Sequence, residues 1–158
     1  DDEDVAALSK ATRDITEYIV DIAKKEGLAD GLSALPEPVA LHLACHARAQ
    51  NMGQKAAEML RLIPEADLKV IERCSGHGGS WGVMEEYFET AIKVGRPVAR
   101  QAKDFGARFI ASECPLAADH ILQGIERQLD DGQSAPARSY HPVELLALAY
   151  GLAPELNS

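Results

Sequence analysis

The sequence predicts an α/β fold: a small open parallel sheet of three to four strands with helices on both faces, plus an N-terminal helix. Three observations lead to this prediction. Short, continuous apolar runs alternate with segments of helical periodicity, as in parallel strands joined by crossover helices. Hydrophobic residues make up 46% of the 158 residues, which is enough for a packed core. Glycine and proline cluster between these segments, where the chain must turn.

The first 36 residues are predicted to form a helix and a linker. Across residues 1–26, apolar side chains recur at intervals of three and four, with charged side chains on the other face. They are Val5, Leu8, Ile15, Ile19 and Ile22, with Thr12 in the same row. The prolines of Leu35-Pro36-Glu37-Pro38 favour an extended backbone because proline restricts the residue before it. We therefore divide the chain into residues 1–36, the N-terminal helix and linker, and residues 37–158, one α/β domain.

The remaining elements alternate in type along the chain. The apolar runs predicted to be strands are residues 39–44, 68–71 and 107–111. The helical patterns are residues 53–63, 83–94, 116–129 and 141–152. Gly95 and Pro97 are expected to end the helix that begins at residue 83, so that a separate helical piece runs to about residue 105. A polar loop is expected over residues 130–138.

The charge balance and the cysteine count exclude several classes of protein. Lys and Arg number 16 against 25 Asp and Glu, and the net charge of −9 argues against nucleic acid as a partner. No apolar run approaches the ~18 residues that cross a bilayer, and the acidic start is not a secretory signal. Three cysteines cannot form a disulfide scaffold, so a reducing, cytoplasmic setting is expected. The first residue is Asp rather than Met, which suggests a trimmed piece of a longer chain.

Each of the three cysteines follows one of the predicted strands. Cys45 comes after the first strand, Cys74 after the second and Cys114 after the third. The carboxyl ends of parallel strands lie at one edge of a sheet, and ligands bind in the crevice outside that edge. The thiols are therefore expected to converge, and each precedes a predicted helix whose dipole favours the thiolate that binds metals. A lone cysteine is most often an inert buried residue, but three at equivalent positions favour a shared site.

Histidines and glycines surround two of these cysteines. His46 follows the first of them, and His77 lies in the glycine-rich segment Cys74–Gly82, so either is a candidate nitrogen ligand. Gly76 and Gly78 allow the backbone of that segment to approach a bound group and to donate N–H groups to it. The alternative interpretation is a flexible turn with surface histidines. The other histidines, expected to be structural, are His42, His120 and His141.

Three segments resemble the motifs of a known family. Cys45–Asn51, Glu72–Gly82 and Ser112–Ala117 are similar to those of the cysteine-rich CCG domain, in the same order and at similar spacing. That domain occurs in proteins like the B subunit of heterodisulfide reductase and in succinate and lactate oxidoreductase subunits. The likeness is strongest to the C-terminal part of the C subunits of anaerobic glycerol-3-phosphate dehydrogenases, and it runs from about Val39 to Leu152.

The resemblance implies an iron–sulfur electron-transfer domain of a multi-subunit oxidoreductase, with Cys45, Cys74 and Cys114 as ligands of the cluster. The implied partners are a flavin-containing dehydrogenase subunit and a ferredoxin-like domain of the same complex, with electrons passing towards quinone. The protein is then expected in the cytoplasm, with peripheral contact at the inner face of the cell membrane made through the complex.

The chain departs from the family pattern at Ser75 and Ala117, which stand where two further cysteines are expected. A three-cysteine site remains, to be completed by His77, His46 or an external group. Three thiolates and one imidazole also form a structural zinc site, so zinc is an alternative cofactor.

Two further interpretations concern the use of the site. One is a subunit-interaction domain whose cofactor site is vestigial. The other, a cysteine hydrolase using Cys74 and His77, is disfavoured because no acid orients the histidine. Glu113 is expected to be an exposed carboxylate rather than an oxygen ligand.

Overall fold

Four parallel strands form the centre of the fold, in the spatial order β2-β1-β3-β4. They are β1 (Val39–His42), β2 (Leu68–Ile71), β3 (Phe109–Ser112) and β4 (Ser139–Tyr140). β1 and β3 are buried along their whole length, which is why their sequences are continuous apolar runs. This computed structural model describes residues 2–153, so Asp1 and residues 154–158, at the ends of the two predicted segments, lie outside it. The predicted fold class is confirmed.

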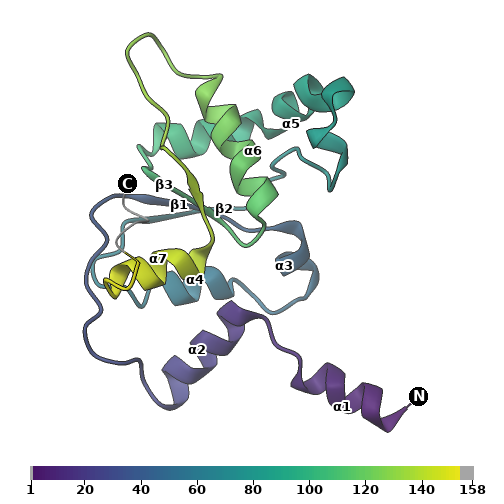
Figure 1. The fold of residues 1–158 in the computed structure, drawn as a ribbon, viewed down its shortest axis with the longest axis vertical. Helices are drawn as coiled ribbons and strands as arrows, with labels where there is room; N and C mark the ends of the chain where they lie inside the picture. Colours follow the sequence, from purple (N-terminus) through teal and green to yellow (C-terminus); the bar gives the residue numbers. More distant parts are fainter. Residues whose placement is uncertain (1, 154–158) are drawn as a thin grey trace.

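Helices cover both faces of the sheet (Figure 1). On one face lie α4 (Lys55–Leu60) and α7 (Pro142–Ala149), and on the other lie α5 (Glu85–Asp104) and α6 (Pro115–Glu126). Neighbouring residues of β1 point to opposite faces and supply two separate cores. Leu41 packs in a cluster with side chains of α4 and α7, whereas Ala40 packs in a cluster with side chains of α5 and α6.

Three short elements go beyond the prediction. β4 extends the sheet beside β3, with Ala111 opposite Tyr140. α3 (Cys45–Ala49) begins at the first cysteine, and a single 3₁₀ turn, η1 (Trp81–Val83), precedes α5. Elements of two to five residues are too short to produce a recognisable period in the sequence.

The N-terminal helix is present but divided in two, so the expectation of one helix over residues 1–26 is wrong. α1 (Glu3–Ala11) ends at Thr12, and α2 (Ile15–Lys25) begins after Asp14. The Asp14 carboxylate accepts hydrogen bonds from the Thr16 N–H and hydroxyl, at 2.8 and 2.6 Å, and so starts a new helix. α2 packs on α4, whereas α1 has no buried residue and extends away from the other elements (Figure 1).

The expected helix break at Gly95 and Pro97 does not occur. α5 is one helix of 20 residues that runs through Pro97. A proline inside a helix removes one backbone hydrogen bond. Here the helix buries Val98, Ala99 and other small side chains against the sheet and α6, and this burial outweighs the lost bond.

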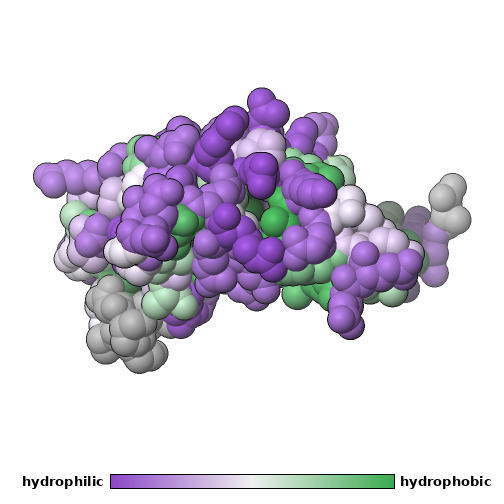
Figure 2. Space-filling view, turned by 90° about the horizontal axis from the view of Figure 1, so that it is seen from above, coloured by the Kyte–Doolittle hydropathy of each residue, from purple (hydrophilic) through white to green (hydrophobic). Residues whose placement is uncertain are grey.

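Figure 2 shows one face, on which hydrophilic side chains dominate and hydrophobic ones form smaller patches between them. Within residues 2–153, no helix combines the length and the apolar character needed to cross a membrane. A cluster of exposed apolar side chains on such a surface is therefore a candidate binding site.

Candidate functional site

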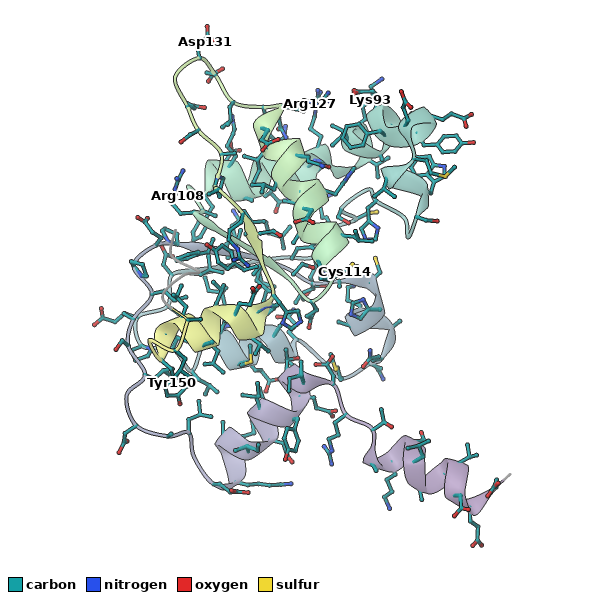
Figure 3. The ribbon with its side chains drawn as sticks, in the orientation of Figure 1. Lys93, Arg108, Cys114, Arg127, Asp131 and Tyr150 are labelled. Atoms are coloured by element: carbon teal, nitrogen blue, oxygen red, sulfur yellow. The ribbon has the colours of Figure 1, made fainter. Side chains whose placement is uncertain are left out.

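The three cysteines line one pocket at the carboxyl edge of the sheet. β1, β2 and β3 are parallel neighbours, and Cys45, Cys74 and Cys114 each follow one of them within a few residues. The pocket has a volume of about 250 Å³, and all three thiols line it. None of these cysteines forms a disulfide. The structure thus brings the three cysteines to one pocket, and Figure 3 shows Cys114 at the start of α6, beside this edge.

A larger hollow of about 810 Å³ lies elsewhere, between α1, the start of α2 and residues 50–52. Neither cysteine nor histidine lines it. Soft metal ions and iron–sulfur clusters need sulfur or nitrogen ligands, so the smaller thiol pocket is the candidate site.

Local structure places each thiol differently. Cys45 is the first residue of α3 and is exposed. Cys74 is also exposed, in the loop after β2, and Cys114 is half-buried at the N-cap of α6. Pro115 occupies the first turn of α6, where its missing N–H leaves no helical hydrogen bond unmade.

His42 links the Cys114 loop to the Cys74 loop. Its Nε2–H donates to the Arg73 carbonyl at 2.8 Å, which leaves Nδ1 to accept from the Ser112 hydroxyl at 3.1 Å. The Ser112 oxygen in turn accepts from the Cys114 N–H at 3.2 Å. Burial lowers the pKa of His42, opposed by its hydrogen bond to Arg73, and this favours the neutral ring that the linkage requires. The prediction that His42 is a buried structural residue is correct.

Glu113 links the Cys114 loop to the Cys45 loop. Its Oε2 accepts a long hydrogen bond, 3.4 Å, from the N–H of Ala44, the residue before the first cysteine. The side chain is only 8% exposed, so the expectation of an exposed carboxylate is wrong. Burial raises the pKa of Glu113, and the Ala44 N–H only partly opposes this effect.

The loop after Cys74 lies directly on α5. Gly76 has φ of +93°, and a Cβ atom there would lie 2.2 Å from the Ala91 carbonyl oxygen. A Cβ atom at Gly95 would lie 2.2 Å from the Ser75 carbonyl oxygen. Both glycines therefore permit a close backbone contact between loop and helix. Gly76 is not among the residues that line the pocket, and its place against α5 accounts for the glycine.

His77 is the histidine that faces a thiol. Its Nδ1–H donates to the Gly79 carbonyl at 3.0 Å, so in the neutral ring Nε2 carries the lone pair. That Nε2 lies 3.5 Å from the Cys114 sulfur. The ring is therefore oriented with its free nitrogen toward a candidate ligand. His46 and Gly78 also line the pocket, as does Ala117. Ser75 lines it as well and is buried.

The donor chemistry of the pocket fits a thiolate-bound metal centre, but the side chains stand apart. Among residues 2–153, no group of three or more Cys, His, Asp or Glu side chains is close enough together to hold a metal ion. Cys45 and Cys74 are exposed, so their side chains have room to change rotamer. The pocket therefore offers suitable ligands, and the thiols would have to turn towards one another on binding.

Two residues of the site carry no metal-binding signal in the sequence. The Ser112 hydroxyl donates to His42 at the end of β1, and Glu113 accepts from Ala44 in the loop after β1. Both bonds depend on the pairing of β1 with β3. The one available signal is their position directly before Cys114, at the end of a predicted strand.

Comparisons with known proteins match the part of the chain that carries the cysteines to a known family. Residues 39–116 match the family CCG, described as a cysteine-rich domain. The chain is 30% identical over 125 residues to the C subunit of anaerobic glycerol-3-phosphate dehydrogenase from Escherichia coli, covering 78% of this chain and 29% of that protein. It is 29% identical over 148 residues to the D subunit of dihydromethanophenazine:CoB–CoM heterodisulfide reductase from Methanosarcina acetivorans, covering 89% of this chain and 34% of that protein. The chain thus spans about a third of the length of these curated relatives. No solved structure matches it.

The matched segment is the part of the chain that builds the pocket. It begins at Val39, the first residue of β1, and ends at Leu116, in the first turn of α6. It includes β1, β2, β3 and all three cysteines. Through residues 39–116, this chain belongs to the family of cysteine-rich CCG domains.

Proposed function

We propose that Cys45, Cys74 and Cys114 hold an iron–sulfur cluster and that this chain passes electrons within a multi-subunit oxidoreductase. One observation carries the proposal: three free thiols from separate loops line a single pocket. Thiolates are the usual protein ligands of iron–sulfur clusters. The similarity to one component of a dehydrogenase and to one component of a reductase supports a role in oxidation and reduction.

His77 is the proposed fourth ligand. The support for it is the hydrogen bond to Gly79, which leaves Nε2 free on the side of the Cys114 sulfur. His46 also lines the pocket, and it is the second choice because none of the described residues orients its ring by a hydrogen bond.

The surroundings of the pocket would adjust the redox potential. When bound, the cluster supplies reversible one-electron transfer. The backbone around Gly76 and Gly78 is proposed to direct N–H groups towards cluster sulfur, and the positive charges of Arg48 and Arg73 would favour the more negative, reduced state.

The proposed partners are a flavin-containing dehydrogenase subunit and a ferredoxin-like domain of the same complex, with electrons passing towards quinone. The support is the naming of the relatives as subunits of a dehydrogenase and a reductase. We place the complex in the cytoplasm, at the inner face of the cell membrane.

Anaerobic purification and reconstitution with iron and sulfide test the proposal. The expected result is bound iron and sulfide in a fixed ratio, visible absorption, and an EPR signal in one redox state. Single Cys→Ser changes at the three cysteines should each reduce the iron content, whereas Ser80→Ala, in the same loop but outside the pocket, should not. His77→Ala should alter the EPR signal and the potential. Protein that binds no iron after reconstitution would contradict the proposal.

Zinc is the second candidate, because three thiols and the His77 imidazole match a structural zinc set. Metal analysis separates the two, since zinc is colourless and has no redox chemistry. The third candidate is an interaction domain with a vestigial site. The distance between the candidate ligand side chains within residues 2–153 favours this third candidate. Retained activity of the complex after replacement of all three cysteines would support it.

A further inference from the structure

An exposed apolar surface lies beside the thiol pocket. Trp81 and Val83 in η1 and Met84 directly after it are 37%, 54% and 49% exposed. The Trp81 ring stacks on Tyr87, with ring centroids 5.2 Å apart, and a Cβ atom at Gly78 would lie 3.7 Å from it. Because Gly78 lines the thiol pocket, Trp81 stands at the edge of that pocket.

Apolar exposure continues around the pocket. Leu116 is two residues after Cys114 and is 50% exposed, and Val94 is 46% exposed and lines a shallow hollow together with Cys74. Exposed apolar groups that gather with a polar border are typical of surfaces that bind another protein. Tryptophan is also among the residues that contribute most binding energy at such surfaces.

The polar border beside Trp81 is acidic. Glu85 and Glu86 form the first turn of α5 and are exposed, and neither makes an ion pair within the described part of the chain. Glu89, one turn later, differs because it is paired with Arg127 at 3.0 Å. The unpaired carboxylates would attract a basic partner and would repel the anionic headgroups of a membrane.

We propose that the Trp81 surface, consisting of Trp81, Val83, Met84, Glu85 and Glu86, docks an electron-transfer protein or subunit with a basic face. This inference rests on the proposed function, because it names the partner of the same redox site. Docking here places the partner at the edge of the thiol pocket, and electron transfer between proteins becomes slower as the distance between the two centres grows.

The proposed docking is tested by measuring the binding of ferricytochrome c to the chain as purified. Ferricytochrome c is a basic redox protein, and its haem quenches fluorescence. Trp81 is the single tryptophan of the chain, so its emission reports contact at this place. We expect saturable quenching at about 10 mM salt that disappears near 0.5 M salt. The Trp81→Phe variant supplies the background signal.

Two pairs of charge reversals distinguish docking at the Trp81 surface from a general attraction of ferricytochrome c to an acidic protein. Glu85→Lys with Glu86→Lys should weaken binding at least about tenfold. Glu3→Lys with Asp4→Lys makes the same change in charge in the first turn of α1 and should leave the affinity within about twofold. Equal weakening by both pairs, or the absence of saturable quenching, would overturn the proposal.

A third variant tests the apolar part without changing charge. Val83→Ser with Met84→Ser should weaken binding about tenfold and leave its salt dependence unchanged, and an unaltered affinity would overturn the proposal. The chain should not bind vesicles of phosphatidylglycerol and phosphatidylcholine. If it does bind them, and if Glu85→Lys with Glu86→Lys strengthens that binding, the proposal would also be overturned. Circular dichroism confirms that each variant is folded.

The outcome is independent of cluster formation. A chain that docks ferricytochrome c but takes up no iron would refute the proposed function alone. A chain that holds a cluster oxidised by ferricyanide, yet does not dock ferricytochrome c, would refute the docking surface alone.

Discussion

At the scale of single residues, the pocket depends on two buried polar side chains that are not proposed ligands. His42 connects the Cys114 and Cys74 loops, and Glu113 connects the Cys114 and Cys45 loops. Both connections start from the last residues of β3 and its loop. These hydrogen bonds hold the three short loops in fixed positions relative to one another before any metal binds. Residues that hydrogen-bond to the ligands of a metal site have the same effect in other proteins.

The change His42→Leu should weaken both the fold and metal binding. It leaves the partly buried Arg73 carbonyl and the buried Ser112 hydroxyl without their partner, at a cost of about 2–4 kcal/mol in the free energy of unfolding. Affinity for cobalt(II), measured by thiolate-to-metal absorption, should fall about 10–100-fold. His46→Leu, at an exposed histidine, should change stability by less than about 0.5 kcal/mol.

A double-mutant cycle tests whether His42 and Ser112 act together. If they belong to one hydrogen-bonded chain, His42→Leu combined with Ser112→Ala should cost less than the sum of the two single changes. Additive losses would show that the two side chains stabilise the protein independently.

Glu113 predicts an unusual pH dependence. Its pKa is raised in the folded protein, so the unfolded chain loses its proton at lower pH and the carboxylate destabilises the fold at neutral pH. Glu113→Gln, which can still accept from Ala44, should therefore increase the free energy of unfolding at pH 7. This gain should shrink as the pH falls from the raised pKa of the folded state towards the ordinary carboxyl pKa of about 4.3, and it should be lost below that value. Urea denaturation at pH 7 and pH 4 measures it, and a gain that is larger at pH 4 would contradict the assignment.

The cysteines could be placed from the sequence, whereas Glu113 could not. Cys45, Cys74 and Cys114 each follow a continuous apolar run, and parallel topology alone brings the ends of such runs together. The hydrogen bond from Ala44 to Glu113 depends on the register of β1 against β3, which leaves no pattern in the sequence.

At the scale of elements, the close contact between the Cys74 loop and α5 positions Cys74, one of the three thiols. The contact requires glycine on both sides, Gly76 in the loop and Gly95 in the helix. It also explains why α5 must be continuous through Pro97: a break near Gly95 would remove the surface on which the loop lies. Gly95 and Pro97 indicate a helix end by local rules, and the long-range contact overrides them.

Gly95→Ala should displace the loop. Its new methyl group would meet the Ser75 carbonyl oxygen at 2.2 Å, so either the loop or the helix must move. We expect a loss of more than about 2 kcal/mol in the free energy of unfolding and weaker cobalt(II) binding. Gly106→Ala is the control, because the new methyl group has no atom within 4 Å, at a positive φ of +73°, and Gly106 does not line the thiol pocket. It should cost only about 1 kcal/mol. Equal losses would show that the loop moves freely on α5.

At the scale of the whole molecule, residues 1–36 do not behave as one unit. α1 buries nothing, and its apolar Val5 and Leu8 are 63% and 68% exposed. The segment after it contacts the α/β part in several ways. Val20 belongs to the core cluster beside α4 and α7, and the Ser33 N–H donates to the Ala149 carbonyl at 2.8 Å. Apolar periodicity extends over both helices, so the sequence does not distinguish the packed helix from the unpacked one.

Truncation should therefore have two very different effects. Removal of residues 1–12 leaves the Asp14 cap of α2 in place and should change the free energy of unfolding by less than about 1 kcal/mol. Removal of residues 1–36 also takes away Val20 and the partly buried Ile19, Leu32 and Leu35. Each apolar side chain of this kind contributes about 1–3 kcal/mol, so the loss approaches the ~5–15 kcal/mol stability of a whole domain.

Urea denaturation of the two shortened chains beside the full chain measures this difference. A chain that begins at residue 37 and unfolds with the same free energy as the full chain would show that the α/β part folds alone, and the predicted division at residue 36 would then be a true domain boundary. If instead it is unfolded or loses most of its stability, residues 15–36 belong to the core of the cysteine-rich domain. In that case the thiol pocket would lose its cobalt(II) affinity in the shorter chain, because its loops would no longer rest on a folded sheet.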